Sequence, residues 1–438
     1  MSFPFLQAGN GGGPWVQRVI NGEADWSHRD GATMCVLDSK RILLIGGWNP
    51  GQWATESTNE IWKSDNGGKT WELLLSHNQT PPTSGAGARF RPVHTPAAVA
   101  CDGYFYLIGS DAQTPHSEVW RTSLAGTGEV WERRTATLHA DWDDRALGIA
   151  GSLDGVLYAM GGMLDVETPS SAQNDVYEST DGGATWTKMN IAVPWSPRAG
   201  VYGMPLIGDR IFLVSGGVYA DECFDGVFAF DGAAWYTINA DGTSPIPFGS
   251  GAGQTAGRYY HSVLRTPDGR VWIVGGSALD PANNIGLGSV WGIAASDDNC
   301  ETWFHFNDIA WGAGLGTHAD ALAVFENRIV RASGNAFDRA TLTINREAIP
   351  PSPTIVSCAP STGPTSTVTT ITGTGFAQGV LGVYVFNGGG PVEAANFAVV
   401  SDTALEVEMP TFPGAVVYFM VFGPGGQGYD NSFSFTYI

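Results

Sequence analysis

A repeated unit constrains the fold of this 438-residue chain more than any other feature of its sequence. In its fullest copy, a hydrophobic strand ends in Gly161-Gly162, a variable loop follows, and a second strand turns tightly into a third that opens on Trp186. The glycine pair lets the backbone pass close to neighbouring strands, where a Cβ atom would clash. The tryptophan offers a large apolar surface for packing one sheet on the next. Strand-rich units that recur every roughly 50 to 60 residues are typical of propellers or arrays.

Four further units follow the same plan. They pair Gly46-Gly47 with Trp71, Gly109-Ser110 with Trp131, Gly216-Gly217 with Trp235, and Gly275-Gly276 with Trp303. This combination resembles the Kelch β-propeller family over about four fifths of the chain. The resemblance implies an all-β fold in which each unit supplies one blade of a ring, and it gives these glycines and tryptophans a structural role.

The turns between the outer strands also resemble Asp-box hairpins, whose pattern is Ser-x-Asp-x-Gly-x-Thr-Trp. Residues Ser179 to Trp186 fit the pattern fully, whereas the copy ending at Trp71 has Asn66 at the Asp position and the copy ending at Trp303 has Cys300 at the Gly position. In Asp-box proteins the motif stabilises a turn on the outer rim. It therefore indicates a way of building a hairpin and says little about chemistry.

The two ends of the repeat region predict how the ring closes. Residues 1–13 are polar and Gly-rich and are expected to form a flexible arm, and Trp15 then opens a strand with no partners before it. Residues 319–325, 328–333 and 341–344 supply three strands with no tryptophan strand after them. We expect the N-terminal strand to complete this last sheet, which removes two exposed sheet edges. The prediction is a six-bladed propeller over residues 14–345, with the fourth blade starting at Val201.

The remainder of the chain predicts a second, smaller domain. Residues 346–353 form a proline-rich linker, in which proline stiffens the joint and blocks strand continuation. Residues 354–438 resemble the IPT/TIG family, a small immunoglobulin-like β-sandwich, through the Thr-Gly-Thr-Gly-Phe run that ends at Phe376 and the closing segment 433–437. Such modules usually connect, space or dimerise. The apolar run 416–422 is expected to be a strand buried on both faces.

Composition limits the partners and the location. The formal net charge of −21, without any run of Lys or Arg, argues against nucleic acid and anionic membranes as partners. The five cysteines lie far apart and no Cys/His spacing suits zinc, so we expect free buried thiols, no metal and no cofactor. No secretory signal and no apolar run of ~18 residues is visible. These features predict a virion-associated or otherwise non-classically exported protein, or else a cytoplasmic one.

Arginines that directly precede innermost strands are the first candidates for binding. In three units an arginine follows a tryptophan by three residues, as Trp26 with Arg29, Trp142 with Arg145 and Trp195 with Arg198; Arg91, Arg258 and His318 stand at comparable places in the other units. Such a ring could grip a carboxylate or sulfate while the tryptophans stack on sugar rings. The same residues could instead pack between blades. Packing is favoured because the pattern repeats, whereas a binding site usually breaks the repeat.

Loops do break the repeat. Trp48 and Trp53 flank a loop after the first glycine pair and could present two aromatic faces, and longer insertions occupy residues 77–91 and 241–257. Long loops are more often functional surfaces than structural necessities. The alternative is that they are disordered decoration.

Catalysis is less favoured than recognition. A sialidase would need an arginine triad, a Tyr assisted by Glu and an acidic Asp, but no suitable Glu falls on an inner strand. A copper oxidase site would need paired Tyr and His, of which only Tyr260-His261 is evident. We therefore assign no catalytic residue and expect non-catalytic recognition of a glycan or protein, with self-association or assembly, as in a phage tail fibre. The alternatives are a carbohydrate-active enzyme of sialidase or sialic-acid mutarotase type, and an intracellular Kelch scaffold.

Overall fold

The computed structural model shows an all-β protein whose described helices are two short 3-10 turns, Pro169–Ser171 and Phe376–Gln378. No helix in the described part of the chain is long and apolar enough to cross a membrane. The structure describes residues 15–19, 26–111, 115–219, 221–243, 246, 257–280, 285–289, 293–305, 318–326, 328–334, 341–345, 353–378, 380, 382–386, 392–394, 396–412, 416–423 and 426–438.

The chain separates into two compact units, of which the first comprises Met1–Trp303 and Asn307–Asn345 and the second Phe304–Phe306 and Arg346–Ile438. The arm expected at residues 1–13 and most of the linker expected at 346–353 lie outside the described residues.

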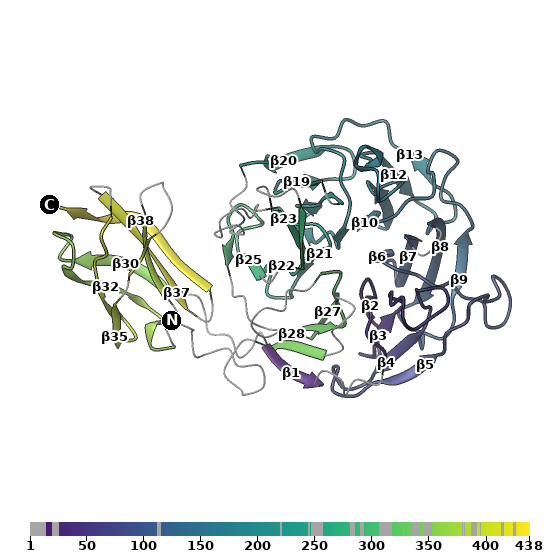
Figure 1. The fold of residues 1–438 in the computed structure, drawn as a ribbon, viewed down its shortest axis with the longest axis horizontal. Helices are drawn as coiled ribbons and strands as arrows, with labels where there is room; N and C mark the ends of the chain where they lie inside the picture. The colour runs from purple at the N-terminus through teal and green to yellow at the C-terminus, as the bar shows by residue number, and fades with distance from the viewer. Residues whose placement is uncertain are drawn as a thin grey trace. The chain divides into compact units, whose positions relative to one another are not determined.

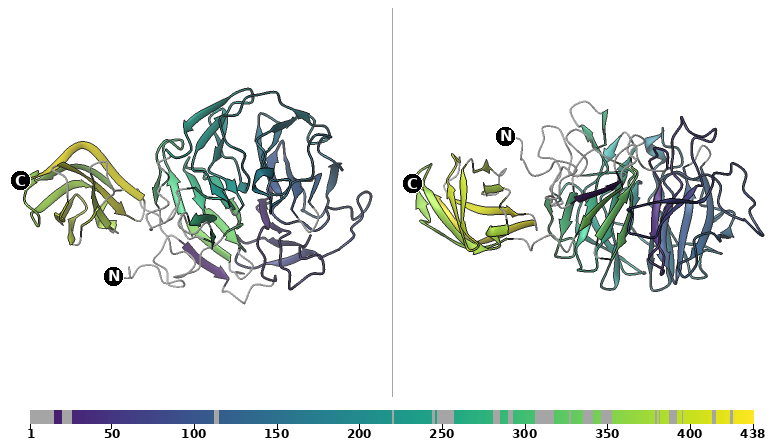
Figure 2. Two further views of the ribbon diagram at one scale, coloured as in Figure 1. Left: turned by 45° about the horizontal axis from the view of Figure 1, so that its top comes forward. Right: turned by 90° about the horizontal axis from the view of Figure 1, so that it is seen from below.

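Six small sheets, five of them made of four strands, dominate the described part of the first unit, and Figure 1 shows them arranged around a common centre. Seen edge-on in Figure 2, strands from several sheets run through the thickness of the unit. Sheet 1 contains β2 (Thr33–Val36), β3 (Ile42–Ile45), β4 (Ile61–Ser64) and β5 (Glu72–Leu75). Sheet 2 contains β6 (Ala97–Cys101), β7 (Tyr104–Ser110), β8 (His116–Ser123) and β9 (Glu132–Thr135), and sheet 3 contains β10 (Ile149–Leu153), β11 (Val156–Met160), β12 (Val176–Ser179) and β13 (Thr187–Lys188).

The remaining three sheets are less regular. Sheet 4 contains β15 (Leu206–Ile207), β16 (Arg210–Val214), β19 (Val227–Phe230) and β20 (Trp235–Asn239), and sheet 5 contains β14 (Val201–Tyr202), β21 (His261–Arg265), β22 (Val271–Val274), β25 (Ile293–Ser296) and β26 (Phe304–His305). Sheet 6 contains β27 (Ala321–Phe325), β28 (Arg328–Ala332), β29 (Thr341–Asn345) and β1 (Trp15–Val19). The hairpins β17–β18 (Gly217–Val218, Glu222–Cys223) and β23–β24 (Ser277–Asp280, Ile285–Ser289) form two further sheets of two strands each.

Sheet 6 joins the two ends of the first unit, as the sequence predicts. Strand β1 pairs antiparallel with β29, with Trp15 opposite Ile344 and Val19 opposite Thr341. The three strands that lack a tryptophan strand of their own thus obtain their outermost partner from the start of the chain. Because β1 covers the outer edge of β29, the backbone groups of that edge are satisfied by a ladder instead of facing solvent.

The inner strand of the fourth repeat differs from the prediction. Instead of one strand from Val201, the structure has β14, which pairs in parallel with β21, and β15, which pairs with β16. Gly203 separates the two pieces, with φ of 105°. A Cβ atom at Gly203 would lie 2.2 Å from the carbonyl oxygen of Val263, so the crossing to sheet 5 requires glycine. Pro205, which has no N–H, follows and prevents β14 from continuing as a ladder strand.

An inner ring of left-handed residues connects neighbouring sheets around the centre of the first unit. One such residue stands just before an innermost strand in each sequence repeat: Gly31, Thr95, Leu147, Gly200, Tyr260 and Ala319, with φ between 44° and 69°. Members of this ring are joined by hydrogen bonds of 2.7–3.1 Å from a backbone N–H to a backbone carbonyl. The donor and acceptor residues are, in turn, Gly31 and Ala319, Thr95 and Gly31, Gly200 and Leu147, Tyr260 and Gly200, and Ala319 and Tyr260. A left-handed residue other than glycine costs about 1 to 3 kcal/mol, so these bonds offset a strain that the ring itself imposes.

Tryptophans fill the space between sheets as expected. Trp71, Trp131, Trp186 and Trp303 are only 3–6% exposed, and Trp235 is half-buried against Phe230 at a ring separation of 4.8 Å. The indole N–H groups of Trp71, Trp131 and Trp186 donate to the carbonyls of Gly68, Gly128 and Gly183 at 3.0–3.2 Å. The side chain of Trp15 lies outside the described residues. The tryptophans therefore contribute large buried surfaces, and in Trp71, Trp131 and Trp186 the indole N–H is also satisfied by a hydrogen bond.

The glycine pairs turn the backbone after the second strand of a sheet. Gly46 and Gly47 both have positive φ, and a Cβ at Gly46 would lie 2.5 Å from Val93 Cγ2. Gly161-Gly162 and Gly275-Gly276 share this conformation. In the fourth repeat the equivalent pair is Ser215-Gly216, with φ of 63° and 106°, and not Gly216-Gly217 as predicted. The first left-handed position of this repeat holds Ser215 instead of a glycine, so the adjacent Gly216-Gly217 was mistaken for the pair in the sequence.

In the turn that ends at Trp186, one side chain accepts most of the hydrogen bonds. The Asp181 carboxylate accepts hydrogen bonds from the N–H groups of Ala184 (3.0 Å) and Thr185 (2.9 Å) and from the hydroxyl of Thr185 (2.6 Å). Ser179 donates to the same carboxylate at 2.9 Å. Asn66 replaces it in sheet 1 and accepts equivalent backbone bonds through its amide oxygen. The turn therefore requires a short side chain with an acceptor oxygen, charged or neutral.

The described part of the second unit is a sandwich of two sheets. One contains β30 (Thr354–Ala359), β32 (Val368–Thr374), β36 (Ala404–Glu408) and β35 (Phe397–Ser401). The other contains β31 (Thr362–Gly363), β38 (Gly426–Tyr437), β37 (Val416–Gly423), β33 (Gly382–Phe386) and β34 (Val392–Glu393). Along β37, Val417, Phe419 and Val421 are fully buried while Val416 is 40% exposed. This corrects the expectation that the strand is buried on both faces, because the sandwich covers one face only.

The Asp181 turn yields a direct test. We expect Asp181→Ala to lower the free energy of unfolding of the first unit by about 1 to 2 kcal/mol, because backbone donors lose a charged acceptor. Asp181→Asn is the control and is expected to cost less than about 0.5 kcal/mol, since Asn66 performs the same role in sheet 1. Chemical denaturation followed by tryptophan fluorescence measures both. An equal loss in the two variants would contradict this account.

Candidate functional site

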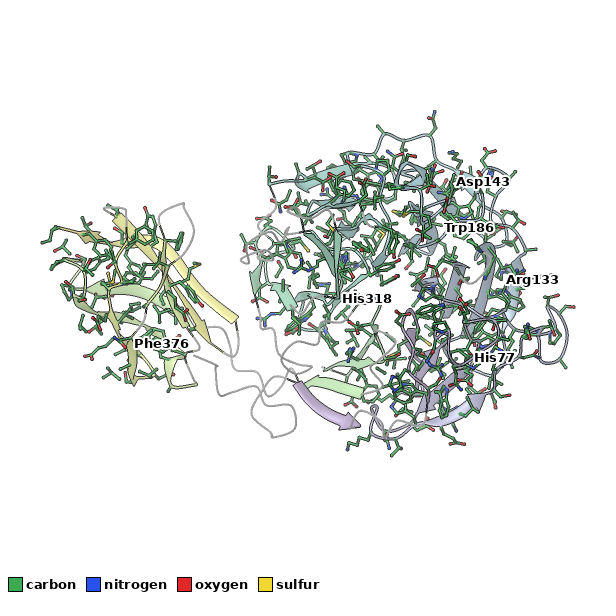
Figure 3. All side chains as sticks on the ribbon, viewed as in Figure 1. His77, Arg133, Asp143, Trp186, His318 and Phe376 are labelled. Carbon is green, nitrogen blue, oxygen red and sulfur yellow. The ribbon has the colours of Figure 1, made fainter. Side chains whose placement is uncertain are left out.

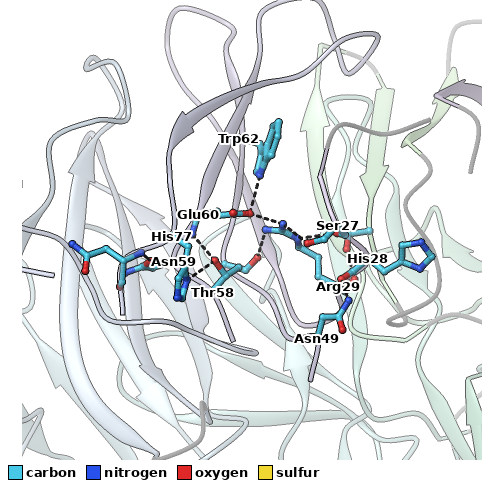
Figure 4. Close-up of polar contacts among 12 residues, drawn as sticks. Ser27, His28, Arg29, Asn49, Thr58, Asn59, Glu60, Trp62 and His77 are labelled. Atoms are coloured by element: carbon cyan, nitrogen blue, oxygen red, sulfur yellow. Dashed lines mark hydrogen bonds and ion pairs between the residues drawn. The ribbon is translucent and has the colours of Figure 1, made fainter. Parts of the chain in front are cut away.

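The arginine before the first inner strand is part of the scaffold. Arg29 is fully buried, and its guanidinium donates to the carbonyl of Gly46 (3.1 Å) and to the Glu60 carboxylate (2.7 Å). Figure 4 shows this contact together with the Trp62 indole, which donates to the same carboxylate at 3.1 Å. Burial lowers the pKa of Arg29, and the Glu60 charge acts against that effect. The arginine thus joins the turn after the second strand to the start of the third.

Two further arginines repeat this arrangement. Each donates to the carbonyl at the left-handed turn after a second strand and to one carboxylate. Arg145 binds Gly161 O (3.0 Å) and Asp175 (2.6 Å), and Arg198 binds Ser215 O (2.9 Å) and Asp241 (2.6 Å). Both arginines are buried, as is Arg258 at 2% exposure. The structure thus assigns these groups to packing, and their burial leaves no guanidinium surface for a carboxylate or sulfate ligand.

The inner ring corrects the placement of two candidates. Arg29, Arg145, Arg198 and Arg258 each stand two residues before an inner-ring residue, but in sheet 2 that place belongs to Val93. Arg91 is instead an exposed residue whose guanidinium binds Glu118 at 2.9 Å. His318 stands one residue before Ala319, not two. Its equivalents in sheets 1 and 2 are Asp30 and His94.

Of the candidate tryptophans, two are buried and two are partly accessible. Trp142 and Trp195 are 4% and 2% exposed, so neither presents a face for a sugar. Trp48 and Trp53 are half-buried, with the Trp53 ring 6.0 Å from His77 and the Trp48 ring 5.9 Å from His94. The loop between these two tryptophans is therefore the aromatic surface that remains available among the predicted candidates.

A partly buried cluster of charges lies where the innermost strands of three sheets begin, and we name it the mouth cluster. It consists of Asp30, His94, Asp111 and His318 from sheets 1, 2 and 6. The Nδ1 of His94 lies 2.6 Å from Asp111 Oδ1, and its Nε2 lies 3.2 Å from Asp30 Oδ1. The Nε2 of His318 lies 3.4 Å from Asp30 Oδ2. Figure 3 shows His318 near the centre of the six sheets.

Mutual pairing sets the protonation of the mouth cluster. Burial alone would lower the pKa of His94, but Asp111 and Asp30 outweigh it and raise that pKa to about 10. Burial alone would raise the pKa of Asp30, but His318 and His94 lower it to about 2. At neutral pH His94 is therefore a cation held between two carboxylates. A group protonated this firmly is a poor general base.

Tyrosines surround the mouth cluster on the side of sheets 4 and 5. The Tyr260 ring lies 5.6 Å from His318, 4.8 Å from Tyr259 and 6.5 Å from Tyr202. Burial, with nearby carboxylates such as Asp111, raises the pKa of Tyr202 and Tyr260 well above the usual value. Both phenols are therefore neutral at ordinary pH, and the Tyr202 hydroxyl interacts with the hydroxyl of Thr95.

A cavity of about 130 Å³ adjoins the mouth cluster. Gly31 and Thr95, the chain neighbours of Asp30 and His94, line it together with Tyr202 and several alanines of the inner strands. Asp320 also reaches the cavity and is paired with Arg331 at 2.7 Å. The cavity is thus lined mainly by apolar residues, together with a few hydroxyl groups and the paired Asp320.

The sequence contains a signal for this cluster that lies outside its repeated glycine, tryptophan and arginine motifs. The residue before the inner-ring position is Asp30, His94 and His318 in three sheets, but Ala146, Ala199 and Tyr259 in the others. A polar group at an otherwise apolar repeat position marks a break in the repeat. This difference becomes visible only when the six repeats are aligned on their inner-ring residues. In the described residues, no group of three or more His, Cys, Asp or Glu, the mouth cluster included, is arranged so that it could hold a metal ion.

Comparison with known families identifies the second unit alone. A model of the IPT/TIG domain family matches residues 353–437, which confirms the resemblance seen in the sequence. The match does not extend into the first unit. A search of curated proteins found no match.

The buried Arg29 of sheet 1 and the exposed Arg91 of sheet 2 should contribute differently to the stability of the protein. We expect Arg29→Ala to lower the free energy of unfolding by about 3 to 5 kcal/mol, because it leaves Glu60 unpaired beside buried backbone. Arg91→Ala, which breaks a partly exposed pair, should cost about 1 kcal/mol or less. Urea denaturation compares the two variants. A small effect of Arg29→Ala would overturn its scaffolding role.

The mouth cluster predicts a loss of stability in alkali. The stabilisation due to His94 is fully present below the unfolded-state pKa of about 6.5 and is lost as the pH rises through about 10. The difference in melting temperature between the wild type and His94→Gln should therefore shrink between pH 7 and pH 10. Differential scanning calorimetry at several pH values measures it. A difference that stays constant over this range would show that His94 is not held protonated.

Proposed function

We propose that residues 15–345 form a six-bladed β-propeller of Kelch type. The support comes from six repeats that each place a left-handed residue before an inner strand, with hydrogen bonds passing from sheet to sheet. The pairing of β1 with β29 closes the last blade. Three turns built like Asp-boxes hold outer hairpins, in agreement with the same assignment.

We further propose that the protein is a non-catalytic recognition and assembly component. The observation that carries this proposal is the internal pairing of charge around the channel: Arg29, Arg145 and Arg198 each bind a carboxylate, and the mouth cluster neutralises itself. Catalysis needs an acid or base free to exchange a proton with a substrate. Recognition needs only shape, hydrogen bonds and aromatic surface, which the Trp48 to Trp53 loop and the tyrosines provide.

The second unit favours an assembly role. It is an IPT/TIG domain, a kind of module that usually connects or dimerises, attached to the recognition unit. The net charge of −21 disfavours polyanionic partners such as nucleic acid. By analogy with the use of such modules, a virion-surface protein such as a tail fibre suits this combination. The partner would be a glycan or a protein on the surface that the particle contacts.

An enzyme of the sialidase or mutarotase type is the alternative. Its support is the mouth cluster, which contains histidine and carboxylate groups at the place where propellers bind ligands. A sialidase, however, holds its anionic substrate with three arginines, and the arginines around this channel are buried in structural pairs. The observations therefore favour binding without turnover.

Binding to an array of neutral and acidic glycans tests the proposal. We expect the intact protein to bind a subset of glycans without altering them, and Trp48→Ala/Trp53→Ala to reduce that signal at least tenfold. The control is Tyr236→Ala, which removes an exposed aromatic ring on β20. Mass spectrometry of the bound glycan shows whether it is altered. Turnover would favour the enzyme, and absence of any glycan binding would shift the proposal to a protein partner.

A further inference from the structure

The turn between β4 and β5 of sheet 1 contains an asparagine followed by a glycine, Asn66-Gly67. An asparagine in this position can lose its side-chain amide without an enzyme. The backbone nitrogen of the next residue attacks the amide carbon, and glycine has no side chain to obstruct that attack. Asn66 is exposed, so water reaches it. The dipeptide therefore has a reactive sequence, and the turn around it decides what the reaction yields.

Three donors converge on the amide oxygen of Asn66. They are the N–H of Lys69 at 3.1 Å, the N–H of Thr70 at 2.9 Å and the hydroxyl of Ser64 at 3.0 Å. Donors at a carbonyl oxygen stabilise the negative charge that develops there when a nucleophile attacks the carbon. The hydrogen bonds that hold this turn therefore also favour attack by the Gly67 nitrogen on Cγ of Asn66.

The group that leaves has a partner as well. The Nδ2 of Asn66 donates to the hydroxyl oxygen of Thr70 at 2.7 Å. An amide nitrogen leaves as ammonia only after it has gained a proton. A hydroxyl within hydrogen-bond reach can pass on that proton and take another from water. Thr70 thus stands where a proton donor to the leaving nitrogen is needed.

The corresponding turn of sheet 3 shows how the product would be held. The donors around the Asp181 carboxylate come from the same turn positions as those around the Asn66 amide, and they lie at 2.6–3.0 Å. Burial alone would raise the pKa of Asp181, but hydrogen bonds, led by those of Thr185, lower it to about 2. This set of donors therefore prefers a carboxylate to a neutral group. An aspartate at position 66 would find every partner already in place.

From these observations we propose that Asn66 is a site of spontaneous deamidation, which converts the turn of sheet 1 into the aspartate turn of sheet 3. The Gly67 nitrogen bonds to Cγ of Asn66 and gives up its proton, the Cγ–Nδ2 bond breaks, and ammonia leaves. Water then opens the succinimide ring. Opening at Cγ gives aspartate, whereas opening at the main-chain carbonyl gives isoaspartate. The inference is independent of the proposed recognition function.

The surroundings of the turn suit aspartate better than isoaspartate. Arg41 and Lys63 contact the neighbouring Asp65 at 2.7 and 3.8 Å, so a new carboxylate enters a region that contains cations. Isoaspartate adds a methylene group to the main chain. Gly67 packs so closely on Phe325 of sheet 6 that a Cβ atom would lie 3.1 Å from its ring. A longer main chain would disturb this contact between the first and last sheets.

Peptide mass spectrometry of the intact protein, aged in mildly alkaline buffer, tests the site. We expect a gain of about one mass unit at Asn66, accumulating roughly tenfold or more faster than at Asn190. Asn190 is the matched control, because it is exposed but is followed by Ile191, whose branched side chain obstructs attack. Fragmentation that separates the two isomers should identify aspartate as the main product. A synthetic peptide of residues 61–75, which lacks the fold, should give mainly isoaspartate.

Two variants test how the product fits. The melting temperature of Asn66→Asp should equal or exceed that of the wild type, because a charged acceptor strengthens the same hydrogen bonds. Asn66→Ala should lower it, because the backbone donors lose their acceptor. A protein that stays unmodified at Asn66 while the peptide converts overturns the proposal. Isoaspartate as the main product of the folded protein, or a lower melting temperature of Asn66→Asp, overturns it equally.

Discussion

The inner ring of backbone hydrogen bonds is the constraint on which the first unit depends. Six residues adopt a left-handed conformation that four of them, Thr95, Leu147, Tyr260 and Ala319, do not favour. Five backbone hydrogen bonds hold them there, and each of the six residues takes part in at least one of these bonds. The ring thereby fixes where every innermost strand starts. It also brings together the residues that precede it, which is how Asp30, His94 and His318 come to share one site.

The buried arginines Arg29, Arg145 and Arg198 form a second set of contacts, next to the inner ring in sequence. Each binds the carbonyl of a left-handed turn and a carboxylate next to a later strand, so one side chain ties these two places to the segment that leads into the inner ring. A guanidinium suits this role because it offers several donors in a fixed plane. The positive charge of each of these arginines is thereby paired with a carboxylate of the protein itself.

Much of the fold was readable from the sequence because its signals are local. Glycine pairs, tight turns and tryptophans report on a few consecutive residues, and they indicated the strands of the first unit and the closing strand Trp15–Val19. The Thr-Gly-Thr-Gly-Phe run that ends at Phe376 likewise indicated the second unit. The exceptions arose where distant contacts decide the outcome. Gly203 lets β14 cross to sheet 5 because Val263 lies behind it, and Ser215 replaces a glycine in a left-handed turn. The mouth cluster joins three sheets, so no single motif contains it.

Closure by β1 also has a consequence for biosynthesis. Trp15 leaves the ribosome early, but its partner Ile344 is among the last residues of the unit to be made. At about 5 to 20 residues per second, β1 waits roughly 15 to 65 seconds for β29. During that interval β1 lacks its partner strand and is exposed to other nascent chains. Crowded synthesis of many copies would therefore favour exchange of β1 between molecules, and chaperones that delay collapse would favour the closed monomeric ring.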